Sequence, residues 1–140
     1  MEWLASLPHR ESLELNAADT APRAARRLIA TVLPQWSLPQ FEVVTSLIAT
    51  ELITNATAAT LAVAWTVATP PLRLWLCGGP SVVAVLAWDA TVIAPVLRDA
   101  ADDDESGRGL AIVAALSAAW GYYYPAEFGG KVTWAIIATP

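Results

Sequence analysis

Two polar residues stand in the most apolar part of this chain, at a spacing that could serve chemistry. Glu51 and Asn55 lie four residues apart within the segment ELITNATAAT. If a helix carries the segment, residues four apart are neighbours on its surface. A carboxylate turned toward an apolar core needs a cation, a metal ion or a water-filled cavity, because alone it is costly or takes up a proton.

The period of the surrounding sequence predicts which way the pair points. With each residue advancing about 100°, the polar side of the helix gathers Ser46, Thr50, Thr54 and Thr57. The opposite side gathers Val44, Ile48, Leu52 and Ala59. Glu51 and Asn55 fall with the apolar group, so we expect both to project toward the sheet or the edge of the core. The alternative is a local role: Glu51 pairs with an arginine such as Arg73, and Asn55 bonds a backbone group.

Two later segments could converge on this pair. Asp89 ends an apolar strand in WDATVIAP, a position where carboxylates often meet ligands, although an Asp is also an ordinary strand terminator. Gly107 and Gly109 open a helical segment in ESGRGL. Glycines let the backbone approach an anion, and the first amides of a helix favour phosphate. The alternative is a plain helix N-terminus that Ser106 caps.

A run of acids precedes these glycines and bears on any phosphate site. Its members are Asp99, Asp102, Asp103, Asp104 and Glu105. They would repel a bare phosphate, unless Mg²⁺ is present or the run swings away as a mobile lid, with Arg108 compensating part of the charge. A solvated loop is the simpler alternative.

The elements that must position these residues are helices grouped apart from a run of strands. A short strand is predicted by the alternation in RESLELNA. The first helix starts near Asp19-Thr20 and stops near Pro34. The second begins around Ser37-Leu38-Pro39, with Ser37 as its cap. LRLWLCGG and SVVAVLAWD form a hairpin, GRGLAIVAALSAAW is helical, and WGYYYP and KVTWAIIA are the last strands. This order predicts a two-layer α/β (α+β) sandwich, in which helices cover one face of a mixed, mostly antiparallel sheet.

Composition narrows the class of protein. The 140 residues suit one domain, spanning 1–140, and 56% of them are hydrophobic, which predicts a compact globular chain. The net charge of -5 argues against direct nucleic-acid binding. Because the start lacks a basic flank and the longest uncharged run contains Pro70-Pro71, we expect no secretory signal and no membrane span, hence a cytoplasmic protein.

Taken in order, the three segments resemble the GHKL (histidine kinase-like) ATPase superfamily, and within it the small anti-sigma factor serine/threonine kinases. The family's Glu-x-x-x-Asn-Ala is matched by Glu51 and Asn55-Ala56, its adenine Asp by Asp89, and its Gly-x-Gly-Leu by Gly107-Arg108-Gly109-Leu110. Trp120-Gly121 and Gly130-Lys131 with Trp134 match the closing pattern. The resemblance covers nearly the whole chain and implies a Bergerat-type ATP-binding fold.

What the resemblance implies about chemistry is specific. Asn55 would hold Mg²⁺ against the triphosphate of ATP, and Asp89 would accept a hydrogen bond from the adenine amino group. The amides from Gly107 to Leu110, Arg108 and Gly109 included, would receive phosphates. Glu51 would be the general base that takes a proton from an attacking hydroxyl. The partners implied are a sigma factor and an anti-sigma factor antagonist, and a homodimer is plausible.

Some positions depart from the family pattern. Where the family has Asp-x-Gly-x-Gly, residues 89–95 contain no glycine, and Ala59 stands near the place of a basic residue. His9 is the only histidine, so the chain is not a complete sensor histidine kinase. These departures motivate a second hypothesis, a degenerate ATPase-fold interaction module without turnover. A third treats every motif residue as packing or caps.

Other polar and aromatic residues are assigned to structure. Lys131 could lie near the phosphates or be a solvated turn lysine, and we favour the turn. Trp88, Trp120 and Trp134 are expected to pack in or beside the core. The only cysteine, Cys77, is interpreted as a small core residue, because no neighbouring His would activate it.

Overall fold

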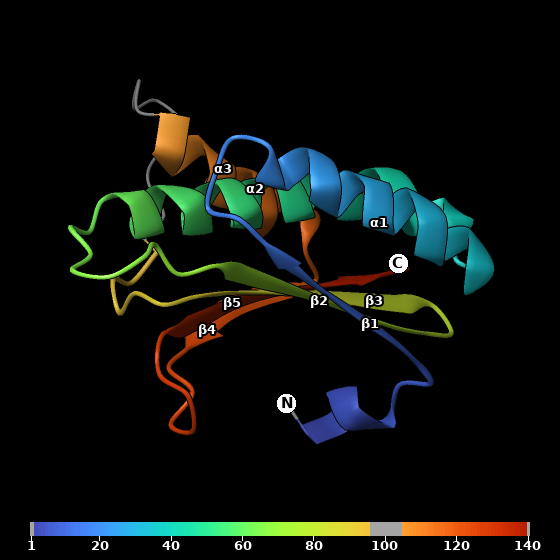
Figure 1. Cartoon of the computed structure of the whole chain (residues 1–140). Helices are drawn as coiled ribbons and strands as arrows, with labels where there is room; N and C mark the ends of the chain where they lie inside the picture. Colours follow the sequence, from blue (N-terminus) through green and yellow to red (C-terminus); the bar gives the residue numbers. More distant parts are fainter. Residues whose placement is uncertain (1, 96–104, 140) are drawn as a thin grey trace.

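One five-stranded sheet carries three α-helices on one of its faces, as Figure 1 shows. The computed structural model describes residues 2–95 and 105–139. The strands are β1 (His9–Leu15), β2 (Leu72–Gly79), β3 (Val82–Asp89), β4 (Ala119–Tyr123) and β5 (Lys131–Ala138). The helices are α1 (Ala21–Gln35), α2 (Glu42–Leu61) and α3 (Glu105–Leu116), with short 3₁₀ helices η1 (Glu2–Ser6) and η2 (Pro39–Phe41).

The sheet has the order β1-β2-β3-β5-β4, and each of these neighbouring pairs is antiparallel. The predicted α+β class with helices on one face is confirmed. The expected mixed character of the sheet is wrong for the described strands. The reason is topological, because β5 lies between β3 and β4 and keeps these two parallel strands from pairing with each other.

The alternation along the strands separates two apolar layers. Side chains on the helix face, such as Leu74, Val85 and Ala135, join α1 and α2 in the main core. The opposite face, which we call the free face, carries a second apolar cluster. It consists of Leu4, Cys77, Ala84, Leu86 and Val132, flanked by Leu7, Trp75, Trp88, Trp134 and Ile136. Cys77 is therefore buried as predicted, under the free face rather than the helices.

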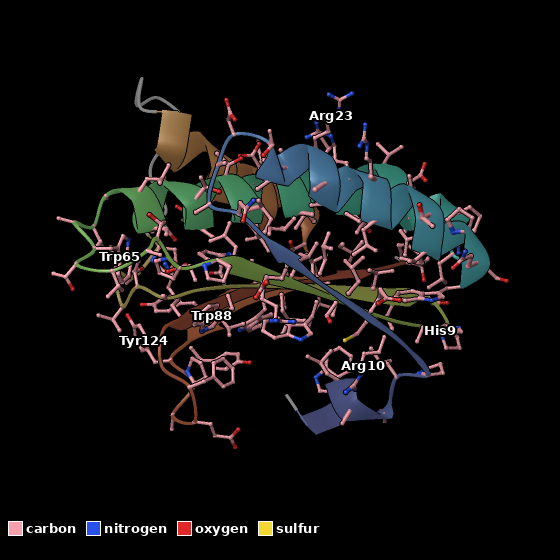
Figure 2. The ribbon with its side chains drawn as sticks, viewed as in Figure 1. His9, Arg10, Arg23, Trp65, Trp88 and Tyr124 are labelled. Atoms are coloured by element: carbon pink, nitrogen blue, oxygen red, sulfur yellow. The ribbon has the colours of Figure 1, made fainter. Side chains whose placement is uncertain are left out.

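Two segments outside the sheet reach the free face, η1 at one end and the β4–β5 connection with Phe128 at the other (Figure 1). Figure 1 shows η1 on the side of the sheet opposite to the helices, and Leu4 of η1 belongs to the second cluster. Figure 2 shows His9 and Arg10 at this end and Trp88 and Tyr124 toward the other. Most of the free face thus lacks a second layer within the described part of the chain.

The connection between α1 and α2 differs from the prediction. The first helix ends at Gln35, close to the expected stop, but Ser37 does not cap the second helix. Ser37 has φ +60°, its amide donates to the carbonyl of Pro34 at 3.0 Å, and the Leu38 amide donates to that of Leu33 at 2.8 Å. This pair of bonds is a Schellman termination of α1. Ser37 therefore closes one helix, and α2 begins only after η2.

Candidate functional site

The helix α2 places Glu51 and Asn55 at the edge of its buried face, one of the two predicted positions. Both are half-buried. The buried face itself consists of Thr45, Ile48, Ala49, Leu52, Ile53, Ala56 and Thr60. Two threonines in that set were not expected; Thr60 satisfies its hydroxyl by donating to the carbonyl of Ala56 at 2.8 Å. Such back-bonding is the usual way for a threonine to sit inside a helix.

Glu51 opens toward an outer groove between α1 and α2, with a volume of about 490 Å³. Arg26 lines the same groove and donates from Nη1 to Oγ1 of Thr50 at 3.3 Å. Partial burial raises the pKa of the Glu51 carboxyl above its usual range. A carboxylate with a raised pKa is a better proton acceptor at neutral pH than an ordinary glutamate. Its role as a base stays a prediction.

The alternative pairing of Glu51 with Arg73 is wrong. Arg73 lies on the free face, where its Nη2 meets Oε1 of Glu14 at 3.4 Å, and both side chains are largely exposed. Asn55 makes no hydrogen bond through its amide within residues 2–95 and 105–139. It stands one helical turn beyond Glu51 on the same flank.

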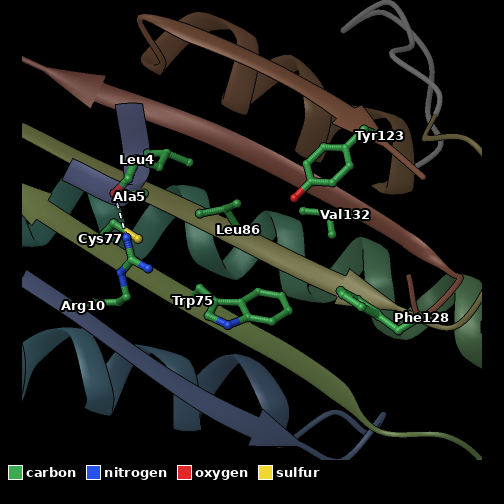
Figure 3. A pocket seen from close by; sticks show the side chains of 9 residues that line it. All are labelled: Leu4, Ala5, Arg10, Trp75, Cys77, Leu86, Tyr123, Phe128 and Val132. Atoms are coloured by element: carbon green, nitrogen blue, oxygen red, sulfur yellow. Dashed lines mark hydrogen bonds between the residues drawn. The ribbon is translucent and has the colours of Figure 1, made fainter. Parts of the chain in front are cut away.

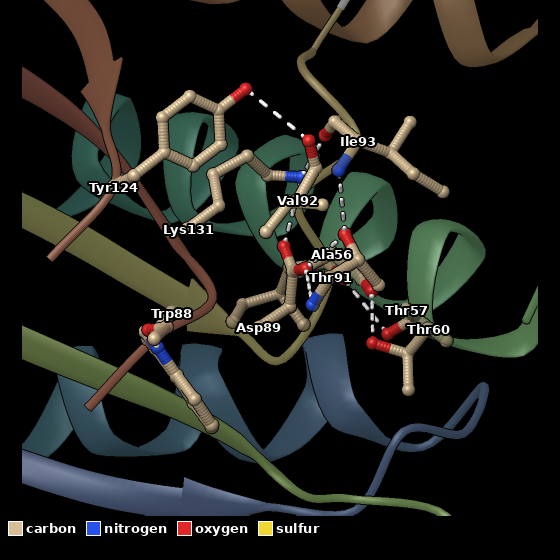
Figure 4. A network of polar contacts seen from close by, with 12 residues as sticks. Ala56, Thr57, Thr60, Trp88, Asp89, Thr91, Val92, Ile93, Tyr124 and Lys131 are labelled. Carbon is tan, nitrogen blue, oxygen red and sulfur yellow. Dashed lines mark hydrogen bonds and ion pairs between the residues drawn. The ribbon is translucent and has the colours of Figure 1, made fainter. Parts of the chain in front are cut away.

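Asp89 lies in a buried polar network at the end of β3, shown in Figure 4. Its Oδ1 accepts hydrogen bonds from the Thr91 amide at 2.9 Å and the Thr91 hydroxyl at 2.6 Å. Its Oδ2 is 3.0 Å from Nζ of Lys131, and each of these two side chains is 1% exposed. Lys131 also donates to the carbonyl of Ile93 at 2.7 Å. The network therefore joins the ends of β3 and β5 to residues 91–93.

The interpretation of Lys131 as a solvated turn residue is wrong. The register pairs Asp89 with Lys131, so both side chains point to the helix face. A charged lysine that is cut off from solvent is stable there only because a carboxylate and a carbonyl accept hydrogen bonds from its ammonium group. A sequence signal existed. Lys131 shares its strand parity with Thr133 and Ala135, which are buried, and this parity argues against an exposed side chain.

The turn before β5 holds the network in place. Trp88 donates from its indole nitrogen to the carbonyl of Gly129 at 2.9 Å. A Cβ on Gly130, whose φ is +72°, would collide with the carbonyl oxygen of Asp89 and with the Trp88 indole. Glycine is therefore required at this position for both conformation and space.

The number of hydrogen bonds that the Asp89 carboxylate can accept bears on how an adenine would bind. A carboxylate offers about four lone-pair positions, and the three contacts above occupy three of them. Within residues 2–95 and 105–139, Oδ1 has two of these contacts and Oδ2 has one. Because the side chain of Asp89 is 1% exposed, its contact with an adenine amino group stays a prediction.

The Gly-x-Gly-Leu segment forms the first turns of α3, which begins at Glu105. Ser106 therefore lies inside the helix and is not its cap. The whole segment from Gly107 to Leu110 lies in the first two turns of this helix, and phosphate binding by its amides stays a prediction. The side chain of Arg108 and the acidic run up to 104 lie outside the described residues, as does the expected lid.

The three motif segments lie on elements that pack together. In the described part of the chain, α2 packs on β3, and α3 packs on α2 and β4. No group of three or more His, Cys, Asp and Glu residues within 2–95 and 105–139 could hold a metal ion. A Mg²⁺ ion at Asn55 would consequently depend on oxygens that a ligand brings with it.

The fold and site define a class in structural terms: an antiparallel α+β protein with a polar network between one sheet face and its covering helices. Comparison with protein-family models and with curated proteins gives no match. None of the helices in the described residues is long and apolar enough to cross a lipid bilayer.

Proposed function

We propose that this chain is an ATP-binding regulatory protein with a Bergerat-type fold, a serine/threonine protein kinase of the anti-sigma factor type. In this role it phosphorylates or sequesters a protein partner, a sigma factor or an anti-sigma factor antagonist. The observation that carries the proposal is spatial. The helix α2, which carries Asn55, packs both on β3, which ends at Asp89, and on α3, which carries Gly107 to Leu110.

In this proposal each residue has one task. Asp89 accepts a hydrogen bond from the adenine amino group, and Asn55 holds Mg²⁺ against the triphosphate. The amides from Gly107 to Leu110 donate hydrogen bonds to phosphate oxygens, which the positive end of the helix dipole favours. Glu51, whose pKa burial raises, takes the proton of the attacking hydroxyl.

The first test is thermal unfolding with and without Mg-ATP. A ligand present at 100 times its dissociation constant adds about 2.7 kcal/mol of stability, or roughly 5 to 10 °C in Tm for a chain of this size. Wild type should shift, and Asn55→Ala should not. Asn16→Ala is the matched control, because Asn16 lies in the connection between β1 and α1. Equal shifts in wild type and Asn55→Ala would refute the metal role.

Phosphotransfer needs its own test. With a candidate partner and radiolabelled ATP, Glu51→Ala should lose transfer while the ATP-dependent Tm shift survives. If the Tm shift disappears together with transfer, Glu51 contributes to binding and not to proton removal.

A second candidate function is an interaction module that has kept the fold without turnover. The observation that favours it is the Lys131 ion pair, because Asp89 is already satisfied by groups of its own chain. This candidate predicts no Tm shift at millimolar Mg-ATP in wild type. Partner binding would then be indifferent to nucleotide, and an ATP effect on that binding would contradict it.

A further inference from the structure

A groove crosses the free face of the sheet, on the side opposite to Asp89 and α2. It has a volume of about 220 Å³ and is shown in Figure 3. Leu4 of η1 and Arg10 of β1 stand at one end, and Tyr123 of β4 and Phe128 stand at the other. Trp75 and Leu86 lie between the two ends. The groove is thus closed at its ends by different segments of the chain.

The register shows that the groove is long and not round. Arg10 pairs with Cys77 on one edge of the sheet, and Tyr123 pairs with Val132 on the other. Four strand spacings separate β1 from β4, which amounts to roughly 19 Å between the edge strands. A compact ring would leave one end of such a groove empty, whereas a flexible linear chain can follow it.

The polar groups at the groove are few and stand at its ends. Arg10 donates from Nη2 to the carbonyl of Leu4 at 2.8 Å, which fixes its guanidinium beside the groove. Burial raises the pKa of the Cys77 thiol, and the charge of Arg10 partly offsets this rise. The positive field therefore reaches into the groove, while Cys77 stays a neutral thiol. Burial also raises the pKa of Tyr123, so its hydroxyl remains protonated at neutral pH.

We propose that this groove binds the anion of a saturated medium-chain fatty acid, with the carboxylate at Arg10 and the acyl chain along Trp75 and Leu86 toward Phe128. The apolar side chains of the groove remove an acyl chain from water, which is worth about 0.8 kcal/mol per buried CH₂. A guanidinium offers the fork that a carboxylate fits. The site lies on the other side of the sheet from the nucleotide proposal, and neither proposal depends on the other.

The chain length of the ligand gives the sharpest test. Octanoate, decanoate and dodecanoate, each below its micelle-forming concentration, are titrated calorimetrically into the purified chain. Each pair of added methylenes should tighten binding between about fourfold and fifteen-fold, as half or all of each methylene is buried, on the basis of about 0.8 kcal/mol per buried CH₂. Decanol, which lacks the charge, should bind more weakly than decanoate.

Two variants locate the site. Arg10→Gln should weaken decanoate about fivefold, the upper range of an exposed ion pair, and should leave decanol unchanged. Arg73→Gln is the matched control, because Arg73 is on the same face but does not line the groove. Phe128→Ala should weaken decanoate and decanol alike. Because Arg10 and Phe128 are exposed, both variants should unfold at the wild-type temperature.

Three results would overturn the proposal. The first is no heat of binding for any of the acids at millimolar concentration. The second is an affinity that does not rise with chain length, or that falls equally in Arg10→Gln and Arg73→Gln. The third is a dimer in sedimentation velocity that decanoate neither weakens nor dissociates, since the free face would then be an interface between two copies.

Discussion

The buried pair of Asp89 and Lys131 gives the sharpest prediction about stability. Replacing Lys131 by Met keeps the apolar stem and removes the ammonium group. Among the described residues, only Thr91 then still contacts the buried charge of Asp89. Removal of one partner from a buried ion pair leaves an uncompensated charge and costs about 3 to 5 kcal/mol. The cost falls on the folded state alone, because the unfolded chain solvates both groups.

The expected size follows from the geometry. At 3.0 Å and an effective dielectric constant of about 20, the lost attraction is roughly 5.5 kcal/mol. The variant no longer has to bury an ammonium group, which offsets part of the lost attraction, and two hydrogen bonds to Oδ1 of Asp89 remain. We therefore expect Lys131→Met to cost about 3 kcal/mol in free energy of unfolding. For a domain of this size that is roughly 6 to 12 °C in Tm.

Urea unfolding followed by circular dichroism measures this cost. Asp89→Asn combined with Lys131→Met should lie within about 1 kcal/mol of wild type, because no charge is left unpaired. Arg73→Met, which breaks the exposed contact with Glu14, is the control and should cost less than about 1 kcal/mol. The reasoning fails if Lys131→Met costs no more than Arg73→Met, or if the double variant shows the sum of its two single costs.

Three further results are expected. Gly130→Ala should be strongly destabilised or fail to fold, while Gly129→Ala, whose Cβ meets nothing within 4 Å, should lose only about 1 to 2 kcal/mol; thermal unfolding of the two compares them. Trp88→Phe should lose about 1 kcal/mol in urea unfolding, as one hydrogen bond to Gly129 disappears. Burial raises the pKa of Glu51, so the stability of the wild type falls as pH rises from the unfolded toward the folded pKa of this carboxyl. Glu51→Gln should therefore be slightly more stable than wild type at pH 7 and equal to it below about pH 4. A stability difference that persists at acid pH would contradict this.

The sequence was sufficient for elements whose signal is local. Apolar runs rich in Val, Leu and Trp located β2 and β3, and the helical period located α2 with Glu51 and Asn55 at the core edge. These predictions rest on neighbours within one turn or one strand, where the chain itself fixes the spacing. The class with helices on one sheet face followed from the order of such elements.

The missed features depend on contacts between distant residues. Lys131 seemed a turn lysine because its partner is 42 positions earlier in the sequence and becomes its neighbour only through the β3–β5 register. Ser37 seemed a cap because the same residue type suits both a helix start and, with positive φ, a helix end. The Ser37 ambiguity can be resolved only with the neighbouring backbone, whereas the strand parity of Lys131 already indicated its burial.

The position of Asp89 connects the stability prediction with the functional one. A buried ion pair is often no more stable than an apolar pair of the same volume, so stability alone does not account for Lys131 in this layer. The pair does fix residues 91–93 through the Ile93 carbonyl and Thr91. If Asp89 also receives a nucleobase, one carboxylate joins the ligand to that segment. Nucleotide binding and the order of residues 91–93 are then coupled through a single side chain.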